Sequence, residues 1–136
     1  MVTHYRFQPQ QESEEVLQRR AAYAAEQARL AAEQKRKKDE AIQRANDLLM
    51  MHLDEKQRRD WRLRQQFYVR SQSGKRFRIR NLGSMNIDEM DEGDRVRANH
   101  CIVAPGVPLP DQLLAQKLML EHNEAEFMRV ANLRTI

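Results

Sequence analysis

The order of apolar and polar positions divides the chain into a helical stretch, a short second helix and a region of alternating strands. Residues 14–51 contain neither Gly nor Pro and consist mainly of Ala, Glu, Gln, Arg and Leu, which predicts one long helix. Ten positions within it follow the alternating four-three spacing of a left-handed coiled-coil seam. The apolar ones among them are the predicted partner-binding residues: Leu17, Ala21, Ala24, Ala28, Ala31, Ile42, Ala45 and Leu49.

This predicted seam can bury only a small apolar area, because Ala side chains are small and because Lys35 and Lys38 interrupt it. Small side chains let a second helix approach closely, which favours a docking arm that packs against partner subunits or against another copy of the chain. The alternative interpretation is a solvated helix whose Ala content reflects helix propensity alone. Acids at helical spacing match the basic run at residues 35–38, which indicates a solvated face there rather than a phosphate-binding one.

A break after the long helix precedes a second, shorter helix that we expect to end near Arg64. Asp54, followed three residues later by Gln57, has the pattern of a capping box, in which each side chain accepts a hydrogen bond from the other residue's backbone. Leu53 and Trp61 are the apolar residues expected to anchor this turn in a core.

After the second helix the apolar period changes from that of a helix to two, which indicates half-buried strands. Two loops with Gly in third place, residues 72–74 and 81–83, predict three-residue hairpins. The first hairpin places Val69 opposite Phe77, and the second places Phe77 opposite Ile87. The apolar side chains of three strands then share one face.

A third turn at residues 91–94 leads into a fourth strand, on which His100 points inward. We expect this histidine to be a hydrogen-bonded core residue rather than a catalytic one. Three prolines within residues 105–110 end the sheet. A helix capped by Asp111 follows, with a wide apolar face and a possible kink at Asn123.

Together these patterns predict an α+β fold with a long N-terminal, coiled-coil-like α-helical arm, a short helix, and a four-stranded antiparallel β-meander covered by a C-terminal helix. The predicted organisation has three parts: an extended N-terminal tail over residues 1–12, an Ala-rich helical docking arm over 13–52, and a small α+β head domain over 53–136. Aromatic residues make up only 6% of the 136 residues, so we expect one small core.

The cysteine content and the hydropathy of the chain bear on where the protein works. Cys101 is the only cysteine, which excludes an intramolecular disulfide and favours a reducing compartment. The first residues lack the apolar stretch of a signal peptide, and no window approaches the roughly 20 apolar residues that span a bilayer. We therefore expect a soluble protein of a reducing, intracellular compartment, without a signal peptide and without membrane partners.

Positive charge is concentrated in one part of the chain. Residues 56–80 hold ten cations and a single acid, although the whole chain carries a net charge of only +4. One interpretation is a polyanion-binding surface; the other is a solvated outer face of the meander, partly matched by acids of the next strand, with Arg76 opposite Asp88. The candidate polyanion-binding residues are Arg58, Arg62, Tyr68, Arg70, Lys75, Arg76, Arg78 and Arg80.

We find no residues in the sequence that predict a cofactor, a metal or catalysis. The four histidines and the cysteine lack the spacing of a zinc site. The acidic turn at residues 88–94 resembles a calcium loop only superficially, because Met90 occupies a ligand position and the closing Glu is missing. There is no glycine-rich phosphate loop and no nucleophile elbow. We therefore expect no enzymatic activity.

Two segments carry a resemblance to a known kind of domain. FYVRSQSGKRFRIR (residues 67–80) contains a hairpin of the form hydrophobic-x-Val-x-Ser-x-Ser-Gly, and AQKLMLEHNEAEFMRVAN (residues 115–132) is a Gln-Lys-Leu helix that ends in Ala-Asn. In these features the chain resembles a small α+β domain that recurs in phage and environmental bacterial proteins, over about residues 53–132. The resemblance implies a viral setting and brings no assigned active residues. The long Ala-rich arm departs from it and suggests a module tethered into something larger.

Three functions remain open at this point. The leading hypothesis is a non-enzymatic structural or assembly protein, most plausibly a phage virion component of the head, neck or tail, that docks through its helical arm on protein subunits or on itself. The alternative is a nucleic-acid-binding protein that uses the arginine-rich helix and hairpin face. The third is a host-directed regulator that binds one acidic protein.

Overall fold

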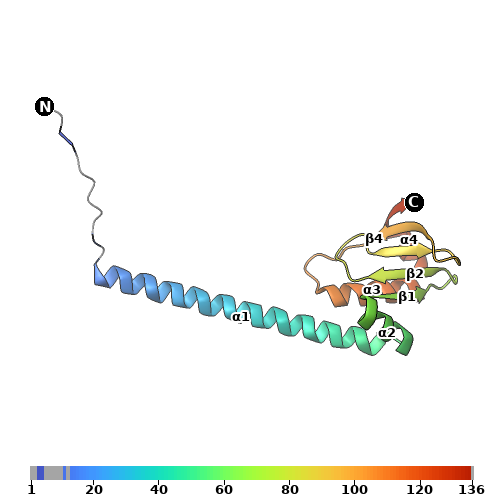
Figure 1. The fold of residues 1–136 in the computed structure, drawn as a ribbon, viewed down its shortest axis with the longest axis horizontal. Helices are drawn as coiled ribbons and strands as arrows, with labels where there is room; N and C mark the ends of the chain where they lie inside the picture. Colours follow the sequence, from blue (N-terminus) through green and yellow to red (C-terminus); the bar gives the residue numbers. More distant parts are fainter. Residues whose placement is uncertain (1–2, 5–10, 12, 136) are drawn as a thin grey trace. The chain divides into compact units, whose positions relative to one another are not determined.

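The computed structural model describes residues 3, 4, 11 and 13–135, which group into two compact units, one ending at Lys38 and the other beginning at Asp39. We call residues 14–38 the arm and residues 39–135 the head, and describe each by itself (Figure 1). Most of the predicted tail over residues 1–12 lies outside the described residues. The predicted α+β class is confirmed.

Helix α1 (Glu14–His52) forms the arm and continues into the head. Its start is stabilised by Ser13, whose side chain accepts a hydrogen bond from the backbone N–H of Val16 at 3.3 Å. The head begins earlier than predicted, since the last turns of α1 belong to it. Ala45 and Leu49 on these turns are only 3% and 0% exposed.

Helix α2 (Glu55–Arg64) begins with the predicted capping box. The Asp54 carboxylate accepts a hydrogen bond from the Gln57 backbone N–H at 2.8 Å, and the Gln57 side chain accepts one from the Asp54 backbone N–H at 3.0 Å. The predicted anchors Leu53 and Trp61 are both buried. The helix ends at Gln65, which adopts a left-handed backbone conformation.

The head contains a five-stranded antiparallel sheet in sequential order, one strand more than predicted. Val69 pairs with Phe77, so the predicted register of the first hairpin is confirmed. Gly74 has a φ of +87°, the left-handed conformation that this loop requires and that Gly adopts without steric cost. The strands are β1 (Gln66–Arg70), β2 (Arg76–Arg80), β3 (Ile87–Met90), β4 (Val96–Cys101) and β5 (Asn132–Thr135).

The second hairpin has a different register from the predicted one. Ile87 pairs with Ile79 rather than with Phe77, because the loop is two residues longer than predicted. The loop closes where the Arg80 backbone N–H donates to the Asn86 carbonyl at 2.9 Å, and Met85 rather than Gly83 takes the left-handed conformation. A shift of two residues leaves every side chain on its predicted face.

The C-terminal region forms two helices and a strand instead of one helix. Helices α3 (Leu109–His122) and α4 (Glu124–Val130) are separated at Asn123, where the sequence predicts a kink. Helix α3 begins before Asp111, with Pro110 in its first turn, where a missing backbone N–H costs nothing. After α4 the chain returns to the sheet, and β5 pairs antiparallel with β4.

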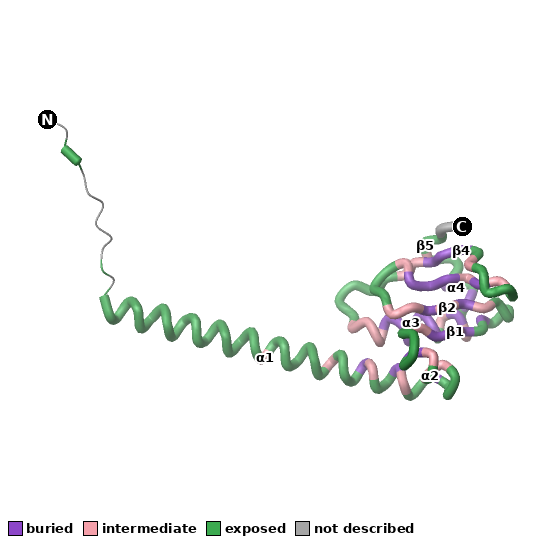
Figure 2. The backbone as a smooth tube through the Cα atoms, viewed as in Figure 1, coloured by how far each residue is buried: buried purple, intermediate pink, exposed green. Residues whose placement is uncertain are grey.

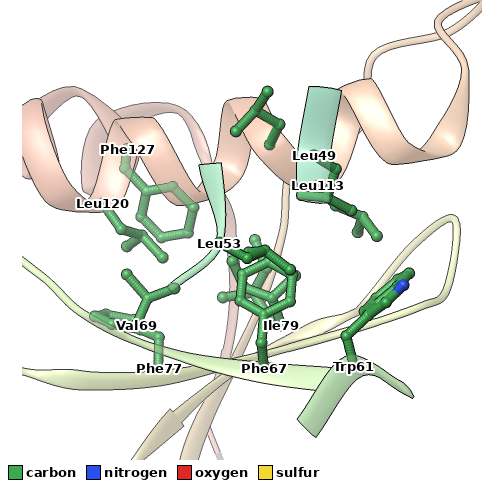
Figure 3. Packing of buried hydrophobic residues seen from close by; sticks show 12 residues of the cluster. Leu49, Leu53, Trp61, Phe67, Val69, Phe77, Ile79, Leu113, Leu120 and Phe127 are labelled. Carbon is green, nitrogen blue, oxygen red and sulfur yellow. The ribbon is translucent and has the colours of Figure 1, made fainter. Parts of the chain in front are cut away.

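The core of the head lies between one face of the sheet and the helices. Figure 2 shows that the buried residues lie in the head, between exposed segments, whereas the arm consists almost entirely of exposed residues. In Figure 3, Phe67, Val69 and Ile79 on the strands face Leu113 and Phe127 on the helices. Burying side chains of this size stabilises the head by about 1.5–3 kcal/mol for each one.

Candidate functional site

The arm presents a row of exposed apolar side chains. We call Leu17, Ala21, Ala24, Ala28 and Ala31 the arm seam. All five are exposed, Leu17 by 52%. At 100° per residue they fall within about 80° of the helix surface, which makes one continuous stripe.

The opposite side of the arm is covered by ion pairs within the helix. Glu15 pairs with Arg19 at 2.6 Å, and Arg29 pairs with Glu26 at 2.6 Å. Glu33 pairs with Arg29 and with Lys37, each at 3.7 Å. The same 100° spacing places these charges about 120–180° from the centre of the arm seam. The arm therefore has one solvated face and an opposite face that, over residues 17–31, has no charged residue at its centre; Lys35 continues that face.

Bulkier apolar side chains line the arm outside the arm seam, about 100–140° from its centre around the helix. Val16, Tyr23 and Leu30 are all exposed and recur every seven residues. Exposed aliphatic and aromatic side chains gathered along one side of a helix are typical of an interaction surface. The exposed apolar surface of the arm thus includes side chains that are larger than alanine.

The remaining three predicted docking residues belong to the head. Ala45 is buried and Leu49 lies in the core cluster, so these two are core residues and are not available to a partner. Ile42 is about half exposed and lines an open hollow of about 580 Å³ with Trp61 and Leu109. The docking surface predicted from the sequence is therefore reduced to the arm seam and Ile42.

The arginines of the second strand surround one buried carboxylate. The Asp88 side chain is 4% exposed and lies 2.8 Å from Arg78 Nη2 and 2.9 Å from Arg80 Nε. It also accepts a hydrogen bond from Asn99 Nδ2 at 2.9 Å. Burial acts to lower the pKa of Arg78, but its hydrogen bond to Asp88 and the charge of Asp88 outweigh this and raise it. Arg78 and Arg80 are thus neutralised within the sheet.

Three further cations of the predicted polyanion surface are also paired. Arg70 pairs with Glu92 at 3.2 Å and Lys75 with Glu89 at 3.3 Å. Arg76 pairs with Asp94 and stacks over the ring of Tyr68, 4.2 Å from its centroid. These acids come from the third strand and the turn after it, so the meander and its loops balance most of the charge of the candidate cations.

The two candidates on α2 differ from each other. Arg58 Nε donates to the carbonyls of Met50 and Leu53, each at 3.0 Å, and so ties α2 to the end of α1. Arg62 is exposed and lines an open hollow with Arg59 and Leu63. Arg70 and Lys75 are exposed as well but pair with acids, so Arg62 is the candidate for which the described residues provide no ion pair or hydrogen bond.

The predictions from sequence missed a network of hydrogen bonds between the first hairpin loop and the junction of α3 and α4. The Glu124 carboxylate accepts hydrogen bonds from Ser71 Oγ at 2.6 Å, Ser73 Oγ at 2.8 Å and the Ser73 backbone N–H at 2.8 Å. In return, the Glu124 backbone N–H donates to the Gln72 side chain at 3.0 Å. Burial alone would raise the pKa of Glu124, but these hydrogen bonds outweigh it and lower the pKa.

A second buried network ties α3 to the loops. Gln116 Nε2 donates to the Ile102 carbonyl at 3.0 Å, and Gln116 Oε1 accepts from Asn86 Nδ2 at 2.8 Å. Gln112 Nε2 donates to the Gly83 carbonyl at 3.0 Å. Among the residues that carry the sequence resemblance, Ser71, Ser73 and Gln116 therefore join the loops of the sheet to the C-terminal helices. The presence of these polar residues in the motif was the one signal in the sequence that could have indicated the two hydrogen-bond networks.

His100 lies in the core, as predicted. It is 1% exposed, with its ring centroid 5.7 Å from that of Phe77 and 5.6 Å from that of Phe127. Its Nε2 has no hydrogen-bond partner, although we expected a hydrogen-bonded histidine. Burial lowers the pKa of His100; the charges of Glu89 and Asp88 oppose this shift and that of Lys75 adds to it, each by less than burial does.

This burial predicts a pH dependence of the free energy of unfolding. Because the folded pKa lies below the unfolded value of about 6.5, the unfolded chain binds the proton first, and stability falls as the pH drops below about 6.5. The slope from one histidine is at most about 1.4 kcal/mol per pH unit. Urea unfolding between pH 7.5 and 5.5, above the range in which Glu124 titrates, measures it. His100→Gln should flatten this slope; an unchanged slope would show that another group is responsible.

Among the described residues, no three His, Cys, Asp or Glu side chains are placed to hold a metal ion. No helix in the described part of the chain is long and apolar enough to cross a membrane. Comparison with protein-family models, with curated proteins and with solved structures gives no match.

Proposed function

We propose that the chain is a non-enzymatic assembly protein that docks on protein subunits through the arm seam. The observation that carries this proposal is the asymmetry of the arm. Its charged residues pair with one another along one face, while an apolar stripe on the other face is exposed to solvent. A partner that covers this stripe gains the free energy of apolar burial, about 25 cal/mol for each Å².

The length of the exposed helix is a second reason to propose a partner for the arm. Residues 14–38 form about 37 Å of helix, yet none of them is buried. Helices in proteins gain most of their stability from packing of an apolar face, and isolated ones are marginal in water. The intrahelical ion pairs are exposed and contribute little. Covering the arm seam would supply the missing packing.

The head fits the role of a structural module. Its buried polar side chains mainly bond to loops and to one another, as Glu124 does with Ser71 and Gln116 with Asn86. The sequence resemblance supports a virion as the setting, in a head, neck or tail position, or the host cytoplasm before assembly. Nucleic-acid binding has weaker support, because seven of the eight candidate side chains have internal partners.

A matched pair of substitutions tests the docking surface. Ala24→Glu places a carboxylate in the arm seam, whereas Ala22→Glu makes the same change on the ion-paired face, so helix propensity changes equally in both. Burying the unpaired carboxylate should weaken docking at least about tenfold. The measurement is sedimentation of each variant with particles from source lysate, before and after nuclease treatment.

The expected result is particle-bound protein for the native chain and Ala22→Glu, resistant to nuclease, and loss of binding for Ala24→Glu. Equal sedimentation of the two variants would contradict docking through the arm seam. Release of the native chain by nuclease would instead indicate that it binds nucleic acid.

A further inference from the structure

We propose that the arm seam pairs with the arm seam of a second copy of the chain, in antiparallel orientation. This inference rests on the proposed docking function and names the partner of that surface. The two arms would be related by a two-fold axis midway along residues 14–38. Such an interface is self-complementary, as closed dimers require.

The spacing of the arm seam supports this register. In an antiparallel pair whose axis passes near residue 26, Ala21 lies opposite Ala31 of the second copy, and Ala24 lies opposite Ala28. Every small residue of the arm seam thus meets another small residue, so the two helices can approach closely along this stretch. The positions that flank it are also uncharged at the centre, where Ala25 is exposed next to the seam.

The charged residues at the two ends of the arm select the antiparallel orientation. Lys35 and Lys38 continue the coiled-coil spacing, and both are exposed. In a parallel pair each lysine would face its own copy across the interface, which repels. In the antiparallel pair, Lys38 faces Glu14 of the second copy, an opposite charge, and the aliphatic part of Lys35 lies along Leu17.

The burial of the later seam positions explains why the pairing stops at the head. Beyond Lys38, the seam positions Ala45 and Leu49 are buried in the core, so no second helix can use them. The available surface is therefore short and rich in alanine, and we expect a weak dimer whose population rises with protein concentration. An interface of this kind is suited to a protein that completes its contacts within a larger assembly.

Disulfide trapping distinguishes the two orientations. The full-length chain is prepared with Cys101→Ser, which removes the native thiol and keeps an acceptor for the Met85 backbone N–H that bonds to Cys101 Sγ at 3.3 Å. Into this background Ala21→Cys and Ala31→Cys are introduced separately, one of them with a mass tag. The two proteins are mixed and oxidised mildly, and the disulfide-linked species are quantified by mass. Sedimentation equilibrium of the native chain is measured in parallel.

The antiparallel pair predicts that the mixed disulfide between Ala21→Cys and Ala31→Cys chains exceeds both self-disulfides at least about tenfold, together with a concentration-dependent dimer. Dominant self-disulfides would overturn the orientation. A monomer at all concentrations without preferred disulfides would overturn self-pairing. If that monomer still sediments with particles through the arm seam, the proposed docking function survives and only the identity of the partner is wrong.

Discussion

A chain that lacks residues 1–38 is expected to form a folded head that no longer docks. All buried residues of the described chain lie between Ala45 and Phe127, so this truncation removes no core contact. The free energy of unfolding of the head should change by less than about 0.5 kcal/mol, as for surface changes in general. Particle binding and self-association should both be lost. Urea unfolding and sedimentation of the truncated chain measure the two effects.

A longer truncation supplies the control for stability. Removing residues 1–52, up to the domain boundary predicted from the sequence, also removes Leu49, which is completely buried in the core. Loss of a buried leucine side chain alone typically costs about 2–5 kcal/mol, and the end of α1 is lost with it. We expect the longer truncation to be unfolded or strongly destabilised. Equal stability of the two truncated chains would show that α1 is not part of the head.

Replacing Asp88 by alanine is expected to destabilise the head by about 2–3 kcal/mol, because it leaves two arginines without their buried carboxylate. The estimate lies below that for a fully buried pair, since the side chains of Arg78 and Arg80 are 24% and 33% exposed and water can reach them. The measurement is the free energy of unfolding in urea at neutral pH.

Asp94→Asn is the control for this substitution, because Asp94 has a φ of +61°, which Asn adopts more readily than Ala. Asp94 also pairs with an arginine of β2, Arg76, but its side chain is 70% exposed. We expect nearly unchanged stability, because exposed ion pairs contribute little. If both substitutions had the same small effect, the arginines of β2 would not depend on Asp88, and the polyanion interpretation of this face would regain support.

Features set by residues close in sequence were predictable. The capping box of α2 depends only on Asp54 and Gln57, three residues apart. The first hairpin depends on a glycine that must adopt a positive φ, and Gly74 does. In both cases one local hydrogen-bonding pattern has no strong competitor, so the sequence specifies it.

The second hairpin shows where such local rules stop. Gly83 allows a tight loop but does not require one, and Met85 instead takes the left-handed conformation, which sequence rules rarely assign to methionine. Two side chains from other elements bond to the longer loop. Asn99 Nδ2 donates to the Met85 carbonyl at 2.8 Å, and Gln112 Nε2 donates to the Gly83 carbonyl at 3.0 Å. Loop length here is decided by tertiary contacts.

The remaining differences from prediction have the same origin. Strand β5 is four residues long and follows a helix without a turn signal, so its pairing with β4 is not visible in the local pattern. Glu124 meets Ser71 and Ser73 across more than fifty residues of sequence. Ala45 and Leu49 continue the spacing of the arm seam, and only the position of the head shows that they are core residues.

Amide hydrogen exchange of the full-length chain tests the docking account most directly. Peptides within residues 14–38 are compared between dilute purified protein and particle-bound protein, with peptides from β1 and β2 as an internal reference. The account predicts that the arm exchanges rapidly in dilute solution and becomes protected in the particle, while the strands exchange equally slowly in both. An arm that exchanges at the same rate in both states, or protection confined to the head, would contradict it.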